Sequence, residues 1–128
     1  MSEINIRPAT AADLDIIVDF SARLADESEG VELDREILSA GVRSALEDSS
    51  KARYFLAEVA GAGGAPEVAG QLMITYEWSD WRNGMFIWIQ SVYVRAEHRR
   101  KGVFKALYNQ VTDLASSPGY CGVRLYVH

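Results

Sequence analysis

The stretch SVYVRAEHRRKGVFKALY, residues 91–108, decides the fold of this 128-residue chain. Its start is typical of a β-strand, because Val92, Tyr93 and Val94 are β-branched or aromatic. The charged segment RAEHRRK then leads to Gly102. Apolar residues recur at helical spacing after it, which predicts a helix over about 102–116 with the buried stripe Val103, Ala106, Leu107, Val111 and Leu114.

A strand, a basic glycine loop and a helix in this order favour an anion site. The N–H groups at Arg100–Val103 would lie at the positive end of the helix without helical partners. Gly102 allows the backbone to approach a ligand closely, and Arg99, Arg100 and Lys101 add positive charge. A diphosphate fits better than a single carboxylate. The plain alternative is a solvated basic surface, and the chain has neither a G-x-G-x-x-G nor a P-loop pattern.

The rest of the chain predicts one domain over residues 1–128 with the order β-α-α-β-β-β-α-β. Thr10 is a good helix N-cap, and the acidic run DESEGVE, residues 26–32, predicts a loop. The helix after it has the apolar stripe Leu33, Ile37, Leu38, Val42 and Leu46. The strands are expected at 4–7, 54–59, 68–77, 85–94 and 122–127, and the first helix at 11–25.

Residues 91–108 resemble the acetyl-CoA signature of the GNAT superfamily of N-acetyltransferases. The core of that signature is Q/R-x-x-G-x-G/A, here Arg99–Phe104, and Val92-Tyr93-Val94 matches the apolar-x-apolar strand before it. The resemblance covers essentially the whole chain. It implies an α/β (α+β) fold with a mixed, mostly antiparallel twisted sheet and helices on both faces.

The resemblance also implies a function: transfer of acetyl from acetyl-CoA, as cosubstrate, directly to a primary amine of a small molecule or peptide. The Val92 N–H would polarise the thioester carbonyl. The implied cofactor-binding residues are Val92, Tyr93 and Val94 along the pantetheine arm, and Arg99, Arg100, Lys101, Gly102, Val103 and Phe104 around the pyrophosphate.

Two positions depart from the family pattern. Phe104 stands where Gly or Ala is usual, and we interpret its ring as facing the core, one turn from Tyr108. Gln90 and Ser91 stand where many members have acidic residues, so the central strand offers no carboxylate as general base. Gln90 could hold a water or the acceptor amine, and Glu77 is the alternative base.

The C-terminal end is a third departure, since the family normally continues after a strand like 122–127 with a helix and two strands. Nothing follows His128 here. We therefore expect a C-terminally incomplete fold with an exposed strand edge, which favours a homodimer through that strand. A CoA-binding module, or a truncated fragment with little catalytic activity, is the alternative function.

Two groups of residues are candidates for the acceptor side. Trp78 and Trp81 offer aromatic walls suited to an amine cation. The acidic run with Glu27 falls beside the acceptor by family analogy. A hairpin packed by its tryptophans and a solvated acidic face are the structural alternatives. Together the two groups indicate a small cationic amine or a basic peptide terminus.

Composition narrows the classes of function. The formal net charge of −5 argues against nucleic acid as partner. Cys121 is the single cysteine, and with no Cys-His or His-x-x-x-His spacing we expect no metal. The N-terminus lacks the apolar segment of a secretory signal, and the longest apolar run, Met85–Ile89, is too short to span a bilayer. We expect a cytoplasmic protein that does not bind membranes.

Overall fold

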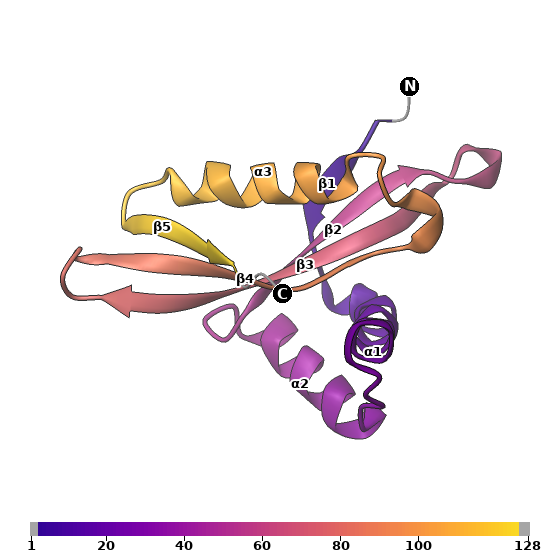
Figure 1. The fold of residues 1–128 in the computed structure, drawn as a ribbon, viewed down its shortest axis with the longest axis horizontal. Coiled ribbons are helices and arrows are strands. Elements are labelled where there is room, and N and C mark those ends of the chain that lie inside the picture. The colour runs from indigo at the N-terminus through magenta and orange to yellow at the C-terminus, as the bar shows by residue number, and fades with distance from the viewer. Residues whose placement is uncertain (1–2, 126–128) are drawn as a thin grey trace.

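Five strands form one twisted sheet whose spatial order, β1-β2-β3-β4-β5, is also their order along the chain (Figure 1). The computed structural model describes residues 3–125. Neighbouring strands are antiparallel except β4 and β5, which are parallel. The elements are β1 (Asn5–Pro8), α1 (Leu14–Glu29), α2 (Arg35–Glu47), β2 (Arg53–Ala60), β3 (Pro66–Ser79), β4 (Gly84–Val94), α3 (Val103–Ala115) and β5 (Tyr120–Leu125).

The helices cover both faces of the sheet, as the sequence predicts. On one face lies α3, whose residues Val103, Leu107 and Val111 pack against buried side chains of β2, β3 and β4. On the other face α1 and α2 enclose a second core with Ile17 and Val42 at its centre. Each face of the sheet is therefore covered by its own apolar layer. The strand edges and the ends of the helices lie outside these layers, where a site can form.

The first helix is longer than the sequence suggested. Residues 26–29, expected in a loop, form the last turn of α1, because the helix stops only at Gly30. Gly30 adopts the left-handed conformation, with φ of 64°, and its N–H bonds back to Asp26. Ile37 was expected in the buried stripe of α2, but it is 73% exposed.

At the other end of the chain, β5 begins at Tyr120, two residues before the expected strand. The last residues of that strand, 126–128, lie outside the described residues. In the described sheet β5 is an edge strand. The homodimer through this strand stays a prediction.

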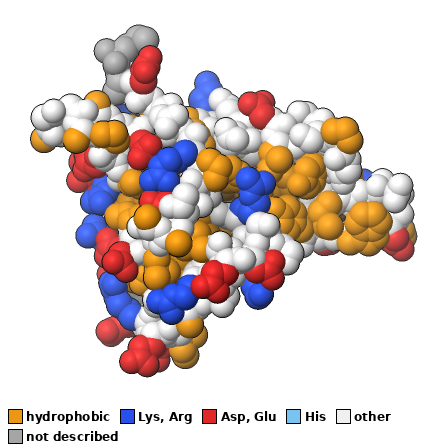
Figure 2. Space-filling view, turned by 180° about the vertical axis from the view of Figure 1, so that it is seen from behind, with side chains coloured by type: hydrophobic (Ala, Val, Ile, Leu, Met, Phe, Trp, Pro, Cys, Tyr) orange, Lys and Arg blue, Asp and Glu red, His pale blue; other side chains and the backbone are white. Residues whose placement is uncertain are grey.

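Long strands β3 and β4 extend beyond the helices as an arm, seen at the left of Figure 1. Seen from behind, apolar side chains gather over this arm (Figure 2). Trp78 lies in β3 near the tip of the arm and is 58% exposed. Trp81 lies in the turn at the tip and is 92% exposed. Within residues 3–125, no helix is both long and apolar enough to cross a bilayer, and no three His, Cys, Asp or Glu residues cluster as metal ligands do.

A partly buried ion pair joins β1 to the start of α1. Arg7 donates two hydrogen bonds to Asp13, Nη1 to Oδ2 at 2.8 Å and Nη2 to Oδ1 at 2.9 Å. The Thr10 N–H donates to Asp13 Oδ2 as well, at 2.8 Å. The Arg7 hydrogen bonds, followed by the Thr10 N–H, hold the pKa of Asp13 below its usual value despite its burial.

We expect the Arg7–Asp13 pair to make the free energy of unfolding depend on pH in the acidic range. A carboxylate whose pKa is lowered by folding stabilises the native state above its unfolded pKa, and that stability is lost as the pH falls through the folded pKa. The free energy of unfolding should therefore drop below about pH 4. Asp13→Asn should cost about 1–3 kcal/mol at pH 7 and flatten the acid slope, measured by urea unfolding at several pH values. An unchanged slope in the variant would contradict this assignment.

Candidate acetyl-CoA and acceptor site

A β-bulge interrupts β4 at Ser91. Gln90 pairs with Met73 and Tyr93 with Gln71, so Ser91 and Val92 together face the single residue Leu72. Ser91 has a φ of 51°, a conformation that non-glycine residues seldom adopt. The bulge is held by Gln71, which is fully buried. Its Nε2 donates to the Ser91 carbonyl at 3.0 Å and to the Ser21 hydroxyl at 3.2 Å.

Beyond the bulge, no described strand pairs with one edge of β4. The pairing of β4 with β5 ends at Ile89 and Leu125 in the described part of the chain. On the opposite edge the Arg95 N–H donates to Ala69 of β3 at 2.8 Å. Because successive N–H groups of a strand point to opposite edges, those of Val92 and Val94 point away from β3. They face the side of β4 on which β5 lies, past the last described pair, Ile89 and Leu125.

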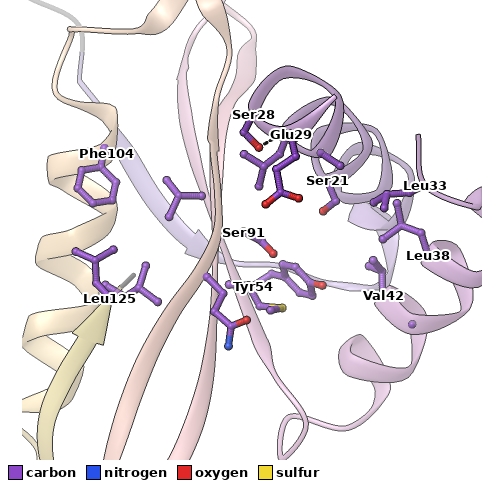
Figure 3. Close-up of a pocket in the computed structure, with 17 residues that line it drawn as sticks. Ser21, Ser28, Glu29, Leu33, Leu38, Val42, Tyr54, Ser91, Phe104 and Leu125 are labelled. Carbon is purple, nitrogen blue, oxygen red and sulfur yellow. Dashed lines mark hydrogen bonds between the residues drawn. The ribbon is translucent and has the colours of Figure 1, made fainter. Parts of the chain in front are cut away.

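A cavity of about 750 Å³ opens beside this edge. In Figure 3, Phe104 and Leu125 lie on one side of β4, and Glu29, Leu33 and Leu38 on the other. The described residues that line it come from both helical layers: Ser21, Leu24, Ala25, Ser28, Glu29, Leu33, Leu38, Gly41, Val42, Tyr54, Met73, Ile89, Gln90, Ser91, Val92, Phe104 and Leu125. It is therefore a mostly apolar chamber with a few polar groups, as small-molecule sites usually are.

A second, smaller cavity of about 220 Å³ lies at the start of α3. Arg100 and Gly102 both have positive φ, 64° and 86°, and this turn leads into the first helical residue, Val103. The N–H groups of the first helical turn have no partners within the helix and attract anions. The lining residues are Val94, His98, Arg99, Arg100, Gly102, Val103, Phe104 and Lys105. The expected anion site thus has positive side chains around a helix N-terminus, although Lys101 is not among its lining residues.

An ionic latch, which we define as Glu27, Tyr93 and Arg99, joins the end of α1 to the basic loop. The Tyr93 hydroxyl donates to Glu27 Oε2 at 2.6 Å, and Arg99 Nη2 donates to Glu27 Oε1 at 2.8 Å. These hydrogen bonds, Tyr93 first, hold the pKa of Glu27 below its usual value. Arg99 also donates through Nε to the Val94 carbonyl at 2.9 Å. The latch fixes the loop relative to the strand edge.

Phe104 joins the two cavities, since it lines both. The interpretation that its ring faces the core is wrong: the residue is 40% exposed, and its ring lies 6.0 Å from that of Tyr108, centroid to centroid. Its position on the first turn of α3 points it to the gap, while Val103 takes the buried position.

The structure separates the other expected site residues. Gln90 and Val92 line the large cavity. Glu77 does not: its Oε1 accepts a hydrogen bond from Trp88 Nε1 at 2.6 Å on the exposed arm. Trp78, Trp81 and Glu27 also lie outside the residues that line either cavity. Their catalytic or substrate roles stay predictions.

Three residues of the site were missed by sequence reasoning. Gln71 and Tyr54 are buried strand residues and gave no local signal. Glu29 was taken for part of an acidic loop. The helical stripe Ser21, Leu24, Ala25 and Ser28 would have placed Glu29 on the cavity side if the helix had been extended to Gly30.

A strand edge without a described partner, a helix N-terminus with basic side chains and a chamber beside them suit an extended anionic ligand such as an acyl-CoA. Comparison with known proteins agrees. The sequence model described as the Acetyltransferase (GNAT) family matches residues 17–128. The chain belongs to this family and is an acyltransferase. No protein of known, curated function matches significantly.

Solved structures share the fold. The crystal structure of a "possible acetyltransferase" from Clostridium difficile 630 is 47% identical, with a TM-score of 0.88 over 98% of this chain and 80% of that one. A "predicted acetyltransferase with acetyl-CoA" from Clostridium acetobutylicum is 16% identical, with a TM-score of 0.77 over 98% and 81%. Ribosomal-protein-alanine N-acetyltransferase from Brucella melitensis biovar Abortus 2308 is 18% identical, with a TM-score of 0.77 over 98% and 81%.

Proposed function

We propose that this chain transfers acetyl from acetyl-CoA directly to a primary amine of a small molecule or peptide. The observation that carries the proposal is the free edge of β4, where the N–H groups of Val92 and Val94 face the gap beside both cavities. An extended ligand can bind such an edge as an added strand would. Membership of the acetyltransferase family supports the same cosubstrate.

The residues present fit the parts of acetyl-CoA. Its pyrophosphate suits the small cavity, where the first N–H groups of α3 are joined by Arg100 and Lys105. Its pantetheine arm suits the edge of β4 at Val92 and Val94. The ring of Phe104, between the two cavities, offers an apolar surface to the same arm. When bound, acetyl-CoA supplies the acetyl thioester.

The chain's own groups have distinct tasks in this proposal. The Val92 N–H donates to the carbonyl oxygen on which negative charge develops. Gln90 is anchored, because its Nε2 donates to the Thr75 hydroxyl at 2.6 Å. Its Oε1 is then left to accept a hydrogen bond from the amine in the large cavity. Gln90 orients the nucleophile in this scheme, whereas Glu77 would have to act from outside the cavity.

A CoA-binding module with little activity is the second candidate. It is favoured by one observation, the absence of a carboxylate on β4 next to Val92, where Gln90 and Ser91 stand. Binding of acetyl-CoA without turnover would separate it from the enzyme.

Calorimetric titration with acetyl-CoA, beside a thermal melt, tests the proposal. We expect binding and a native state stabilised by about 2.7 kcal/mol at a ligand concentration of 100 Kd. Release of free CoA thiol on addition of an amine panel should follow. Gly102→Ala is the matched variant: an added Cβ would meet no atom within 4 Å, so it perturbs only the backbone with φ of 86°. It should weaken binding. No binding by folded wild-type protein would refute the proposal.

A further inference from the structure

The large cavity has one charged side chain among the described residues that line it, Glu29. No lysine, arginine or histidine of the described chain lines it. The carboxylate of Glu29 points into the cavity (Figure 3). A single negative charge in an otherwise uncharged chamber favours a ligand with a single positive charge.

Glu29 is also unpaired, unlike Asp19 and Glu27 of the same helix. Asp19 forms ion pairs with Arg23 and Arg35, and Glu27 with Arg99. Glu29 forms no ion pair or side-chain hydrogen bond with another described residue. It is the last residue of α1, where the negative end of the helix dipole adds to the attraction for a cation.

The walls around Glu29 are apolar. The cavity is lined by Leu24 of α1, Leu33 of the following loop, Leu38 and Val42 of α2 and Met73 of β3. Tyr54 also lines the cavity; it is buried, and its hydroxyl makes no hydrogen bond with another described residue. Burial raises the pKa of Tyr54, so its hydroxyl stays protonated at neutral pH. A polycation would leave most of its charges against hydrocarbon, which is costly.

We propose that the acceptor is a primary monoamine with an apolar body, an alkylamine or arylalkylamine, whose ammonium group pairs with Glu29 while its body packs against the leucine-lined wall. This inference rests on the proposed function and gives the acceptor its chemical class. Gln90 and Val92 line the same cavity. The nitrogen therefore binds in the chamber where the β4 edge is free.

Calorimetric titration with amines tests the class directly. The protein is titrated with propylamine, hexylamine, 2-phenylethylamine and spermidine, each with and without saturating CoA. We expect affinity to rise by up to about fourfold per added methylene from propylamine to hexylamine. Spermidine should bind more weakly than hexylamine. Tighter binding of spermidine, or no dependence on chain length, would overturn the proposal.

Two variants test whether Glu29 is the residue that binds the ammonium group. Glu29→Gln should lower the affinity for 2-phenylethylamine about tenfold, because the ammonium group loses its charged partner. Asp26→Asn is the matched control, an acid on the same last turn of α1 that lines neither cavity, and should change nothing. Equal affinity in wild type and Glu29→Gln would overturn the assignment. The readout is independent of turnover: if acetyl-CoA binds and no amine does, this inference fails and the cofactor site stands. If amines bind as expected and acetyl-CoA does not, the proposed function fails, and Glu29 is left as an amine-binding residue without an acceptor role.

Discussion

A backbone ester at Val92, made by incorporating the α-hydroxy analogue of valine, should lower kcat for acetyl transfer by about 10²–10³. The change replaces a single N–H by oxygen and keeps the side chain. That N–H points away from β3, so no backbone hydrogen bond between β3 and β4 is lost, and the one interaction weakened is that of Gln71 Nε2 with the Ser91 carbonyl. The affinity for acetyl-CoA should change far less than kcat, because stabilisation of developing charge contributes mainly to the transition state. Steady-state kinetics and calorimetry on the same sample separate the two.

Val92→Ala is the control for this experiment, since it shortens the side chain and keeps the N–H. Its kcat should stay within a few-fold of wild type, although packing against the α3 core weakens. If the ester retained full kcat, or if Val92→Ala lost as much as the ester, the Val92 N–H would not be the group that stabilises the carbonyl oxygen.

Gly70→Ala should destabilise the fold by about 1–3 kcal/mol and weaken acetyl-CoA binding as well. A Cβ at Gly70 would lie 2.8 Å from the Tyr93 carbonyl oxygen and 3.1 Å from Val103 Cγ1. One of these atoms is backbone, so β4 or the first turn of α3 must move. Both carry groups of the cofactor site, and displacement of about an ångström is enough to disturb a positioned ligand. Urea unfolding and calorimetry measure the two effects.

Gly41→Ala is the matched control, with the opposite sign expected. Gly41 lies within α2, and an added Cβ there meets no atom within 4 Å. Alanine in a helix is favoured over glycine by about 1 kcal/mol, so unfolding should require more urea. A gain in stability from Gly70→Ala, or a loss from Gly41→Ala, would contradict this account of the packing.

The sequence predicted the fold well where apolar residues recurred at a regular spacing and glycine or charged residues marked the ends of the element. The strand ending at Val94, the turn at Gly102 and the helix after it are confirmed, as are the element order and the helices on both faces. The end of α1 was misplaced because acidic residues are compatible with a loop or an exposed helix end. Only the capping at Gly30, in its left-handed conformation, decides between them.

The site was harder to predict, since it depends on contacts between distant segments. Phe104 follows Val103 on the same helical turn, and periodicity alone does not say which of the two faces the sheet. Gln71 acts on Ser91 from another strand, twenty residues away. The length of β3 and β4 carries Trp78 and Trp81 beyond the helices, and their role in binding the acceptor stays a prediction. Sequence spacing contains none of this information.

The ionic latch of Glu27, Tyr93 and Arg99 has a consequence for how two ligands share one protein. Glu27 and Glu29 belong to the same last turn of α1, and Arg99 belongs to the loop at the anion cavity. A ligand that restrains the loop therefore restrains the turn that carries Glu29, the residue proposed to pair with the acceptor's ammonium group. If one substrate raises the affinity of the protein for the other by some factor, the second raises the affinity for the first by the same factor. The latch thus offers a route by which the two binding events are coupled in the ground state, in whichever order the substrates arrive.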